Sequence, residues 1–491
     1  MSTENKSFLQ VIGSFNKTFW TASIMELFER WAWYGLFAVL ALYLTGSTDD
    51  GGLGFTHTEK GQIMGIVTAI LYMLPLFTGV ISDKIGYKLS LIIAYVMLIS
   101  GYYLMGEVSS YPLVFLVFLY VAVGAAIFKP VASAIITKST DKSNSTLGFG
   151  IFYMMVNIGG FIGPAFSSTL RTQYGWKIIF IQAAVVIFIN LLIAIFFFKE
   201  PERVKKEEHL KEALLSSLNN IWEALKDKKL TVLLIIMVGF WTMFNQLFYT
   251  LPTFIEDWIN TAALHDSIAQ VSPWLASFMS GGGKSINPEM LINIDAGAII
   301  LLQLTVSYFV LKMRHVSAMT IGFIIAAIGI GITFYTGNGL YTILGIVIFA
   351  VGEMMTNPTF SSFIALISPK GKEALYMGTY FVPVFVGNFL TTFVSGNLYQ
   401  SWSDKLSLLQ SEMTKRSISM PEITLEFTKN DYFSLASDKL NMTQVQMTQM
   451  IWDSYQPNKI WYVIVGIGVV TITALMIYDR MVIRPNDKKT S

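Results

Sequence analysis

Residues 18–48 read TFWTASIMELFERWAWYGLFAVLALYLTGST, an apolar stretch long enough to cross a bilayer as one helix. The charged residues of this stretch stand almost together near its middle, at Glu26, Glu29 and Arg30. Insertion scales assign each such charge a cost of roughly 2.5–3.5 kcal/mol at the centre of a helix, so the cluster opposes insertion unless its members pair. The spacing places all three on one helix face, where Glu26 and Arg30 are i,i+4 partners. A charged face inside a membrane helix predicts a polar cavity beside it.

The composition is that of a multi-span membrane protein. The chain has 491 residues, of which 53% are hydrophobic and 13% charged, and its mean hydropathy is +0.55. The net charge of +2 and the scattered basic residues give no support for nucleic-acid binding. There is no cysteine and only four dispersed histidines, so we expect no metal site and no cofactor. Residues 1–17 lack the apolar core of a signal peptide, and we expect the first span to stay in the mature protein.

Apolar windows of about 20 residues predict an all-α protein with twelve transmembrane helices. The expected spans lie near 18–45, 58–82, 89–107, 112–137, 146–168, 176–198, 230–255, 290–311, 316–336, 340–368, 373–399 and 458–482. This pattern divides the chain into a six-helix bundle at 1–198, a charged linker at 199–229 and a second six-helix bundle at 230–491. Leucines at helical spacing predict a surface helix in the linker. Long polar segments at 256–289 and 401–458 interrupt the second bundle.

Lysine and arginine placement predicts the orientation. Alternate loops are basic, whereas the loops at 46–56 and 108–111 contain no lysine or arginine. The segment 401–458 does carry basic residues, but long loops translocate regardless of charge. By the positive-inside rule, the basic loops, the linker and both termini are cytoplasmic, and 256–289 and 401–458 lie outside. The basic positions are Lys84, Lys88, Lys138, Lys142, the 199–229 linker, Lys312, Arg314, Lys370, Lys372, Arg480, Arg484, Lys488 and Lys489.

Residues 79–88, GVISDKIGYK, follow the second predicted span. They fit the pattern Gly-x-x-x-Asp-Arg/Lys-x-Gly-x-Arg/Lys, the loop motif of the major facilitator superfamily, and at this place among twelve spans the match is specific. Glycines permit a tight turn and close helix approach, and the aspartate can cap a helix or pair with a neighbouring one. The gate motif residues are Gly79, Asp83, Lys84, Gly86 and Lys88.

Two further charges stand alone in predicted spans, and a lone charge there is a candidate for the cavity. Lys129 precedes Pro130, which leaves the carbonyl of Ala126 without its usual partner and predicts a kink. Glu353 is the corresponding single charge of the tenth span. Lys129 and Glu353 come from different halves, and we favour an ion pair between them that forms and breaks as a gate.

Other polar and aromatic residues are candidates for the cavity, each with a structural alternative. Asn157 could bind a ligand or only hydrogen-bond a neighbouring helix. Asp295 could contact a ligand or cap a helix, and the aromatic residues could simply pack. The remaining candidates are Trp33, Phe37, Trp241, Asn245 and Gln246.

Enzyme and receptor classes were weighed against transport. The run at 281–285, GGGKS, resembles a phosphate loop, but Phe278 stands where the first glycine is required and no strand precedes it. No nucleophile–base set or metal spacing is present, so we expect no enzyme. A receptor built on a transporter scaffold remains the other alternative. Without ATP binding, transport would run on gradients.

These residues together resemble the proton-dependent oligopeptide transporter family, a branch of the major facilitator superfamily. The first-span motif of that family, Glu-x-x-Glu-Arg-Phe-x-Tyr-Tyr, is similar to 26–34, with Trp31 and Trp33 at two aromatic places. Phe-Lys-Pro is intact at 128–130 and Phe-Tyr-x-x-x-Asn-x-Gly at 152–159, and Glu353 is followed by Pro358. The resemblance implies a major facilitator fold of two six-helix bundles.

The resemblance also implies roles for individual residues. Glu26, Glu29 and Arg30 would couple proton movement to substrate. Arg30, Tyr34 and Lys129 would hold a substrate carboxylate, whereas Asn157 and Glu353 would hold the substrate amine. Family members commonly have an arginine where this chain has Phe37 and an acid where it has Asn245. In the family, that arginine and that acid form a gate pair on the outside. Because this chain lacks both, the sequence predicts a changed gate.

The sequence therefore predicts a proton-coupled symporter, in a plasma or inner membrane, that imports di- or tripeptides or similar small zwitterions by alternating access. Its expected partners are the substrate, protons and the lipid bilayer, and we expect a monomer. The alternative is a major facilitator carrier of another organic anion or an amino-acid conjugate.

Overall fold

The computed structural model describes residues 12–141, 144–201, 209–369 and 372–485, and within these ranges the ordered elements are all helices. The predicted basic positions Lys142, Lys370, Lys488 and Lys489, and part of the linker, lie outside the described residues. The first part of the chain forms α2 Lys17–Thr45, α3 His57–Met73, α4 Pro75–Ile85, α5 Tyr87–Met105, α6 Tyr111–Lys138, α7 Ser145–Tyr174, α8 Lys177–Phe196 and α9 Leu210–Leu225.

The second part begins immediately after α9. Its elements are α10 Lys228–Phe244, α11 Gln246–Tyr249, α12 Leu251–Trp258, α13 Thr261–Val271, α14 Pro273–Ser280, α15 Pro288–Val310, α16 His315–Tyr335, α17 Gly339–Ile367, α18 Glu373–Gly378, α19 Phe381–Thr392, the π-helix η1 Phe393–Leu398, α20 Tyr399–Trp402, α21 Lys405–Lys415, α22 Lys429–Leu440, α23 Gln444–Tyr455, the 3₁₀ helix η2 Pro457–Lys459, α24 Ile460–Tyr478 and the π-helix η3 Asp479–Ile483.

The described part of the chain is that of a multi-pass membrane protein. Ten helices are long and apolar enough to span a bilayer, and the bent pair α3–α4 counts as an eleventh. Helix α2 has 29 residues, and counting it despite its charged turn gives the twelve spans that the sequence predicts. The second span is not straight, because α3 and α4 meet at 47°. Pro75 opens α4 and has no N–H to continue the hydrogen-bond ladder of α3.

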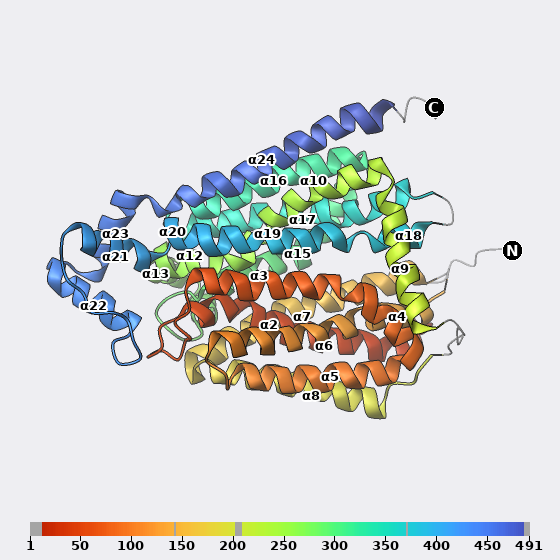
Figure 1. The fold of residues 1–491 in the computed structure, drawn as a ribbon, viewed down its shortest axis with the longest axis horizontal. Coiled ribbons are helices and arrows are strands. Elements are labelled where there is room, and N and C mark those ends of the chain that lie inside the picture. The colour runs from red at the N-terminus through yellow and green to blue at the C-terminus, as the bar shows by residue number, and fades with distance from the viewer. Residues whose placement is uncertain (1–11, 142–143, 202–208, 370–371, 486–491) are drawn as a thin grey trace.

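The helices form two groups that lie side by side (Figure 1). Helices α2–α8 make one group, and α10 to α24 make the other. Helix α9 crosses from α4 to α18 at one end, which we call the α9 end, while α21–α23 stand at the opposite α22 end. The expected surface helix of the linker is α9, and its outer face leaves Trp222 exposed.

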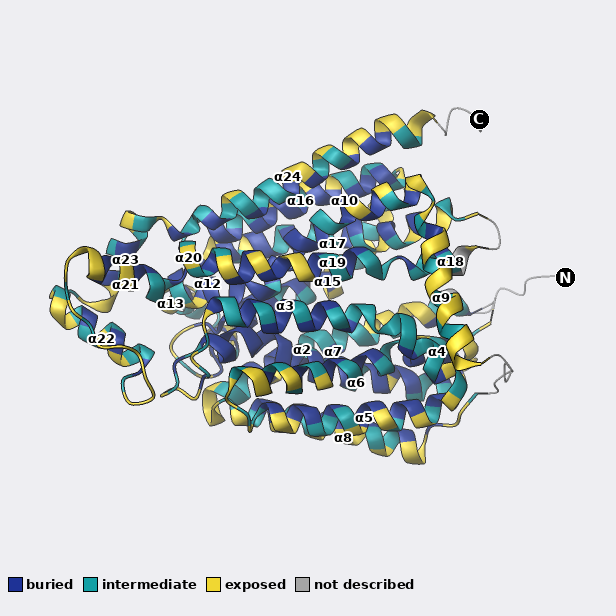
Figure 2. Ribbon diagram, in the orientation of Figure 1, coloured by how far each residue is buried: buried dark blue, intermediate teal, exposed yellow. Residues whose placement is uncertain are grey.

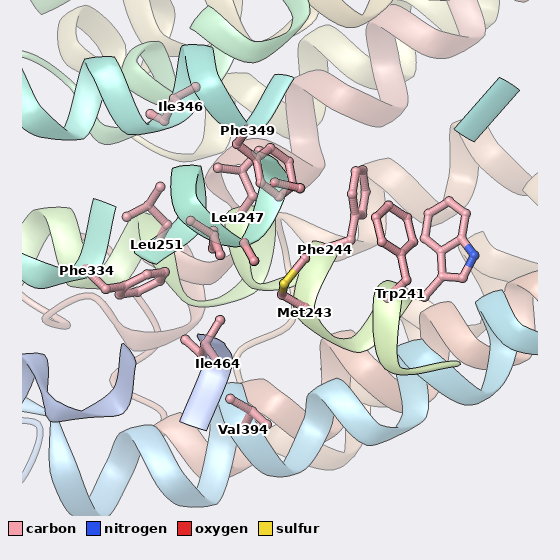
Figure 3. Close-up of a cluster of buried hydrophobic side chains, with 14 of the residues drawn as sticks. Trp241, Met243, Phe244, Leu247, Leu251, Phe334, Ile346, Phe349, Val394 and Ile464 are labelled. Carbon is pink, nitrogen blue, oxygen red and sulfur yellow. The ribbon is translucent and has the colours of Figure 1, made fainter. Parts of the chain in front are cut away.

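Each group buries its own apolar cluster. One cluster is drawn from residues 15–198 together with Tyr249, and the other from residues 224–478 together with Ala165. Buried positions run along the facing sides of the helices in both groups (Figure 2). In the second group, Phe244, Leu251, Phe349 and Ile464 bring α10, α12, α17 and α24 together (Figure 3). Separate cores are what two bodies need if they are to move relative to each other.

The charged turn of α2 is fixed by close packing against α7. Helix α2 begins at an N-cap, where Asn16 accepts from the Phe19 N–H at 2.8 Å. On α7, a Cβ added at Gly159 would lie 2.3 Å from the Leu27 carbonyl oxygen, and one at Gly163 would lie 2.4 Å from that of Trp31. Only glycine permits such an approach of two backbones. The turn of α2 that carries Glu26–Arg30 is thereby held against α7.

Pro130 and the gate motif are part of one contact between α4 and α6. The Thr78 hydroxyl donates to the carbonyl oxygen of Ala126 at 2.6 Å, the acceptor that Pro130 leaves free. A Cβ at Gly79 would meet the Pro130 ring at 3.4 Å. After the motif, Gly86 has φ +108°, and Lys88 Nζ donates to the Ile195 carbonyl at 2.8 Å. Asp83 accepts from the Tyr87 hydroxyl at 2.9 Å, so it joins α4 to α5.

The contact of α2 with α7 predicts an asymmetric response to alanine along α7. Gly163→Ala places a methyl against the Trp31 carbonyl, and overpacking of this kind destabilises by about 1–3 kcal/mol. Gly150→Ala is the matched control, because nothing lies within 4 Å of its Cβ position and alanine is the better helix former by about 1 kcal/mol. We expect a lower melting temperature in detergent for Gly163→Ala and an unchanged or higher one for Gly150→Ala. Equal melting temperatures would contradict the packing described.

Candidate functional site

A cavity of about 340 Å³ lies between the two groups of helices. Its wall is largely aromatic, with a set of amides and three acids, and neither arginine nor lysine is among the described residues that line it. The aromatic residues are Trp33, Tyr34, Phe37, Tyr72, Tyr153, Trp241, Phe244, Phe248, Tyr249, Tyr380 and Phe381. The polar residues are Thr68, Asn157, Asn245, Asn293, Asn357, Asn388, Glu289, Asp295 and Glu353.

The charges of α2 pair with one another behind this wall. Glu26, Glu29 and Arg30 are all buried. Arg30 Nε donates to Glu29 Oε2 at 2.6 Å and lies 3.3 Å from Glu26 Oε1. Tyr34 lines the cavity, and its ring centre is 5.8 Å from the guanidinium carbon of Arg30. Since one cation faces two carboxylates, the cluster is one positive charge short of neutrality, and a single proton can supply it.

Lys129 also stands behind an aromatic residue and not beside Glu353. Its ammonium nitrogen is 4.2 Å from the ring centre of Tyr72, which lines the cavity. In the described part of the chain, no ion pair joins Lys129 to Glu353, so the favoured gate pair is not formed in this conformation. Lys129 lies behind the wall formed by α2 and α3, and Glu353 belongs to the wall formed by α15 and α17.

Two carboxyl groups meet on the opposite wall. Asp295 of α15 and Glu353 of α17 lie within hydrogen-bonding range of each other. No donor from another described residue reaches Asp295 Oδ1 or Glu353 Oε2. Asp295 does not cap its helix, because α15 begins at Pro288 after Asn287. The capping alternative is therefore wrong, and Asp295 lines the cavity.

The predicted amides divide into two kinds. Asn157 and Asn245 line the cavity, and Asn157 donates to the Tyr153 carbonyl of its own helix at 2.9 Å. Gln246 does not line the cavity. Its amide nitrogen donates to the Thr242 carbonyl at 2.8 Å and its oxygen accepts from Thr250 at 2.6 Å. Consecutive residues of a helix point in directions about 100° apart, so Asn245 and Gln246 cannot share one face.

Aromatic rings make contacts around Phe37, the position at which the resembled family commonly has an arginine. Phe37 stacks on Trp33 at 5.5 Å and makes an edge contact with Tyr249 at 5.4 Å, so the ring contact joins the two groups. Tyr249 and Tyr380 were missed by sequence reasoning. Their hydroxyls donate to Asn388 at 2.7 Å and Asn357 at 2.6 Å. The signal that could have found these two residues is a tyrosine within an apolar span, combined with an amide side chain on a neighbouring helix.

Polar bridges join the two groups at the α22 end. Arg171 of α7 makes two hydrogen bonds to Glu289 of α15, at 3.0 and 3.2 Å, and Glu289 is fully buried. The Asn287 amide donates to the Ser168 hydroxyl at 2.7 Å. Asn430 of α22 donates to Asp50 at 2.7 Å. These contacts tie the two groups of helices together at the α22 end.

One group of side chains of the types that can bind a metal ion also lies at the α22 end. His57, Asp257 and Asp404 place ligand atoms within 4.8 Å of one another, a grouping that the scattered histidines did not suggest. The three are already engaged, however. His57 lies 3.3 Å from Asp404, and the Tyr399 hydroxyl donates to Asp257 at 2.8 Å. Burial raises the pKa of Asp257, which opposes the charge a metal ion would need. We assign no metal to this group.

Comparison with known proteins agrees with this geometry. A model of the Major Facilitator Superfamily matches residues 22–286. Dipeptide and tripeptide permease B of Aliivibrio fischeri is 30% identical over 169 residues, which is 34% of this chain and 33% of that protein. Dipeptide and tripeptide permease A of Escherichia coli is 28% identical over 180 residues, 36% of this chain and 35% of that protein. The chain thus spans about a third of the length of the curated relatives it matches.

Solved structures resemble the whole chain in fold. A peptide transporter POT in complex with sulfate gives a TM-score of 0.66 at 15% identity, covering 97% of this chain and 99% of that one. The nucleoside transporter NupG gives 0.64 at 14% identity, covering 94% and 99%. The matches are to transporters, not to enzymes. The family model, the curated relatives and the twelve-span fold agree that the chain belongs to the major facilitator superfamily, with peptide transporters of the POT family among its relatives.

Proposed function

We propose that this protein is a proton-coupled symporter that imports di- or tripeptides, or similar small zwitterions, by alternating access. The observation that carries the proposal is the buried cluster of Glu26, Glu29 and Arg30, separated from an aromatic cavity by Tyr34. Buried charges in a membrane helix are retained where they take part in transport. The sequence likeness to dipeptide and tripeptide permeases supports the peptide class.

The cluster suggests how a proton would be coupled to substrate. While both glutamates are charged, Arg30 is held by them. Glu26 is the more distant of the two glutamates, with its Oε1 3.3 Å from Arg30 Nε. Protonation of Glu26 would leave Arg30 paired with Glu29 alone, and so weaken the attraction that holds the guanidinium against α2. Tyr34, Arg30 and Lys129 would then receive the substrate carboxylate, while Asn157 and Glu353 would receive its amine. An organic anion without an amine, the alternative, suits the acidic far wall less well.

Alternating access would move the bundles 1–198 and 230–491 about this cavity, with the linker 199–229 between them. Their separate apolar cores support such a motion. We place the α9 end and both termini in the cytoplasm, of a plasma or inner membrane, because Lys84, Lys88 and Lys138 stand at that end. The bridged α22 end then faces outside. We expect the protein to act as a monomer.

Removing either carboxylate of the cluster is expected to uncouple transport. In proteoliposomes, one proton moving down 100 mV and one pH unit provides about 3.7 kcal/mol, enough for several hundredfold accumulation of dialanine. Glu26→Gln and Glu29→Gln should reduce accumulation to near equilibrium while leaving counterflow exchange measurable. Glu59→Gln is the matched control, because glutamine also fits the capping box at Thr56. Full gradient-driven accumulation by both cluster variants would contradict the coupling scheme. No dialanine uptake by folded wild-type protein would contradict the peptide class.

The bridges at the α22 end predict which variant opens the cavity to the outside. The chain has no cysteine, so Ala38→Cys in the cavity wall is a background-free probe for a membrane-impermeant maleimide. Adding Glu289→Gln removes the ion pair with Arg171, and charged hydrogen bonds contribute about 1.5–3 kcal/mol. We expect labelling from outside to rise about tenfold or more. Glu412→Gln removes an ion pair within α21 and should change nothing. Unchanged labelling with Glu289→Gln would mean that another contact keeps this end closed.

A further inference from the structure

The wall of the cavity that contains Asp295 and Glu353 has more hydrogen-bond acceptors than the single ammonium group of a simple zwitterion can use. Asp295 and Glu353 lie within hydrogen-bonding range of each other, and each keeps one oxygen that no described donor reaches. Asn293, which is 4% exposed and also lines the cavity, has a free Oδ1 as well, since its amide nitrogen is used by the Phe161 carbonyl. Three residues that line one cavity therefore each have a buried oxygen without a hydrogen-bond partner among the described residues.

Among the described residues, no cation compensates the charge of this wall. Arg30 is held by two glutamates and Lys129 by the ring of Tyr72, both on the other side of the cavity. Glu289, on the same helix as Asp295, is occupied by Arg171. The titratable groups that face the two carboxyls from the neighbouring elements are hydroxyls, on Tyr34 of α2, Tyr153 of α7 and Tyr380 before α19.

Two carboxyls in contact away from water cannot both be ionised without a cation, so the lowest-energy state of an empty pair shares one proton. That state has a net charge of −1, which matches one ammonium group. A second cationic group on the substrate would match the fully ionised pair, and its N–H donors would reach the free oxygens. Aromatic rings around the wall would favour such a cation further.

We propose that Asp295 and Glu353 form a proton–cation exchange site: the pair keeps one proton when the substrate has a single ammonium group and releases it to the solvent when the substrate brings a second cationic group. The cavity therefore prefers peptides with a basic side chain over neutral ones, increasingly so as the pH rises. This inference rests on the proposed function, whose substrate class it narrows. The sequence left the role of Asp295 open, and this proposal makes it one of the two carboxyl groups of the exchange site.

The test compares dialanine with alanyl-lysine on the purified full-length protein in detergent. In weak buffer with an indicator dye, alanyl-lysine should release about one proton more per bound ligand than dialanine. Its affinity relative to dialanine should rise by up to about tenfold per pH unit while the pair holds its proton. Asp295→Asn and Glu353→Gln should each abolish the extra proton and the pH slope. Asp438→Asn, an exposed acid on α22, should change neither.

The outcomes separate this inference from the proposed function. Equal proton release and equal pH slopes for two bound dipeptides would overturn the exchange site and leave peptide binding intact. If neither dipeptide binds but 1,5-diaminopentane, which has two ammonium groups, does bind, with a proton release that Asp295→Asn removes, the peptide class fails and the exchange site stands. If none of the three ligands binds to folded protein, both proposals fail. Asp295→Asn that still binds dialanine shows that the variant is folded.

Discussion

The pairing of Arg30 with Glu26 and Glu29 is the constraint on which the rest of the structure depends. Without it, three charges near the middle of α2 would each cost roughly 2.5–3.5 kcal/mol in the bilayer. The pairing requires a dry, tightly packed surrounding, and this is supplied where Gly159 and Gly163 bring α7 into backbone contact with α2. The same contact fixes the direction of Tyr34, which separates the ions from the cavity. One packing solution therefore sets both the stability of the first helix and the shape of the site.

Much of the fold followed from the sequence, because membrane spans are set by apolar length and by charge. The charged turn of α2, the surface helix α9 and the free carbonyl beside Pro130 were all readable from one segment at a time. What the sequence did not predict depends on contacts between segments. The bend between α3 and α4, the partner of Ala126 on α4 and the direction of Gln246 each depend on packing by a second helix.

The candidate site shows the same difference between what one segment indicates and what depends on contacts between segments. Tyr34, Asn157, Asp295 and Glu353, four of the candidates named from the sequence, line one cavity, and their roles in binding stay a prediction. The pairing among charges was not predictable, since Lys129 and Glu353 are plausible partners by type alone. In the structure a tyrosine covers Lys129, and an acid from the eighth span takes its place beside Glu353. Bridges such as Arg171–Glu289 join residues from different halves, and nothing in either local segment indicates the other.

The resemblance leads us to expect a charge pair at the positions of Phe37 and Asn245, and in this chain other contacts join the two groups of helices there. An ion pair inside the cavity would be broken whenever substrate or proton arrived, so closure and binding would be directly linked. Here Phe37 meets Tyr249 by ring contact, and an ion pair between Arg171 and Glu289 joins the two groups of helices at the α22 end. With phenylalanine at position 37, neither arginine nor lysine is among the described residues that line the cavity together with Asp295 and Glu353. The ring contact and the unpaired acids thus lie where the resemblance leads us to expect a charge pair, and on our proposal such an acidic wall favours substrates that bring positive charge with them.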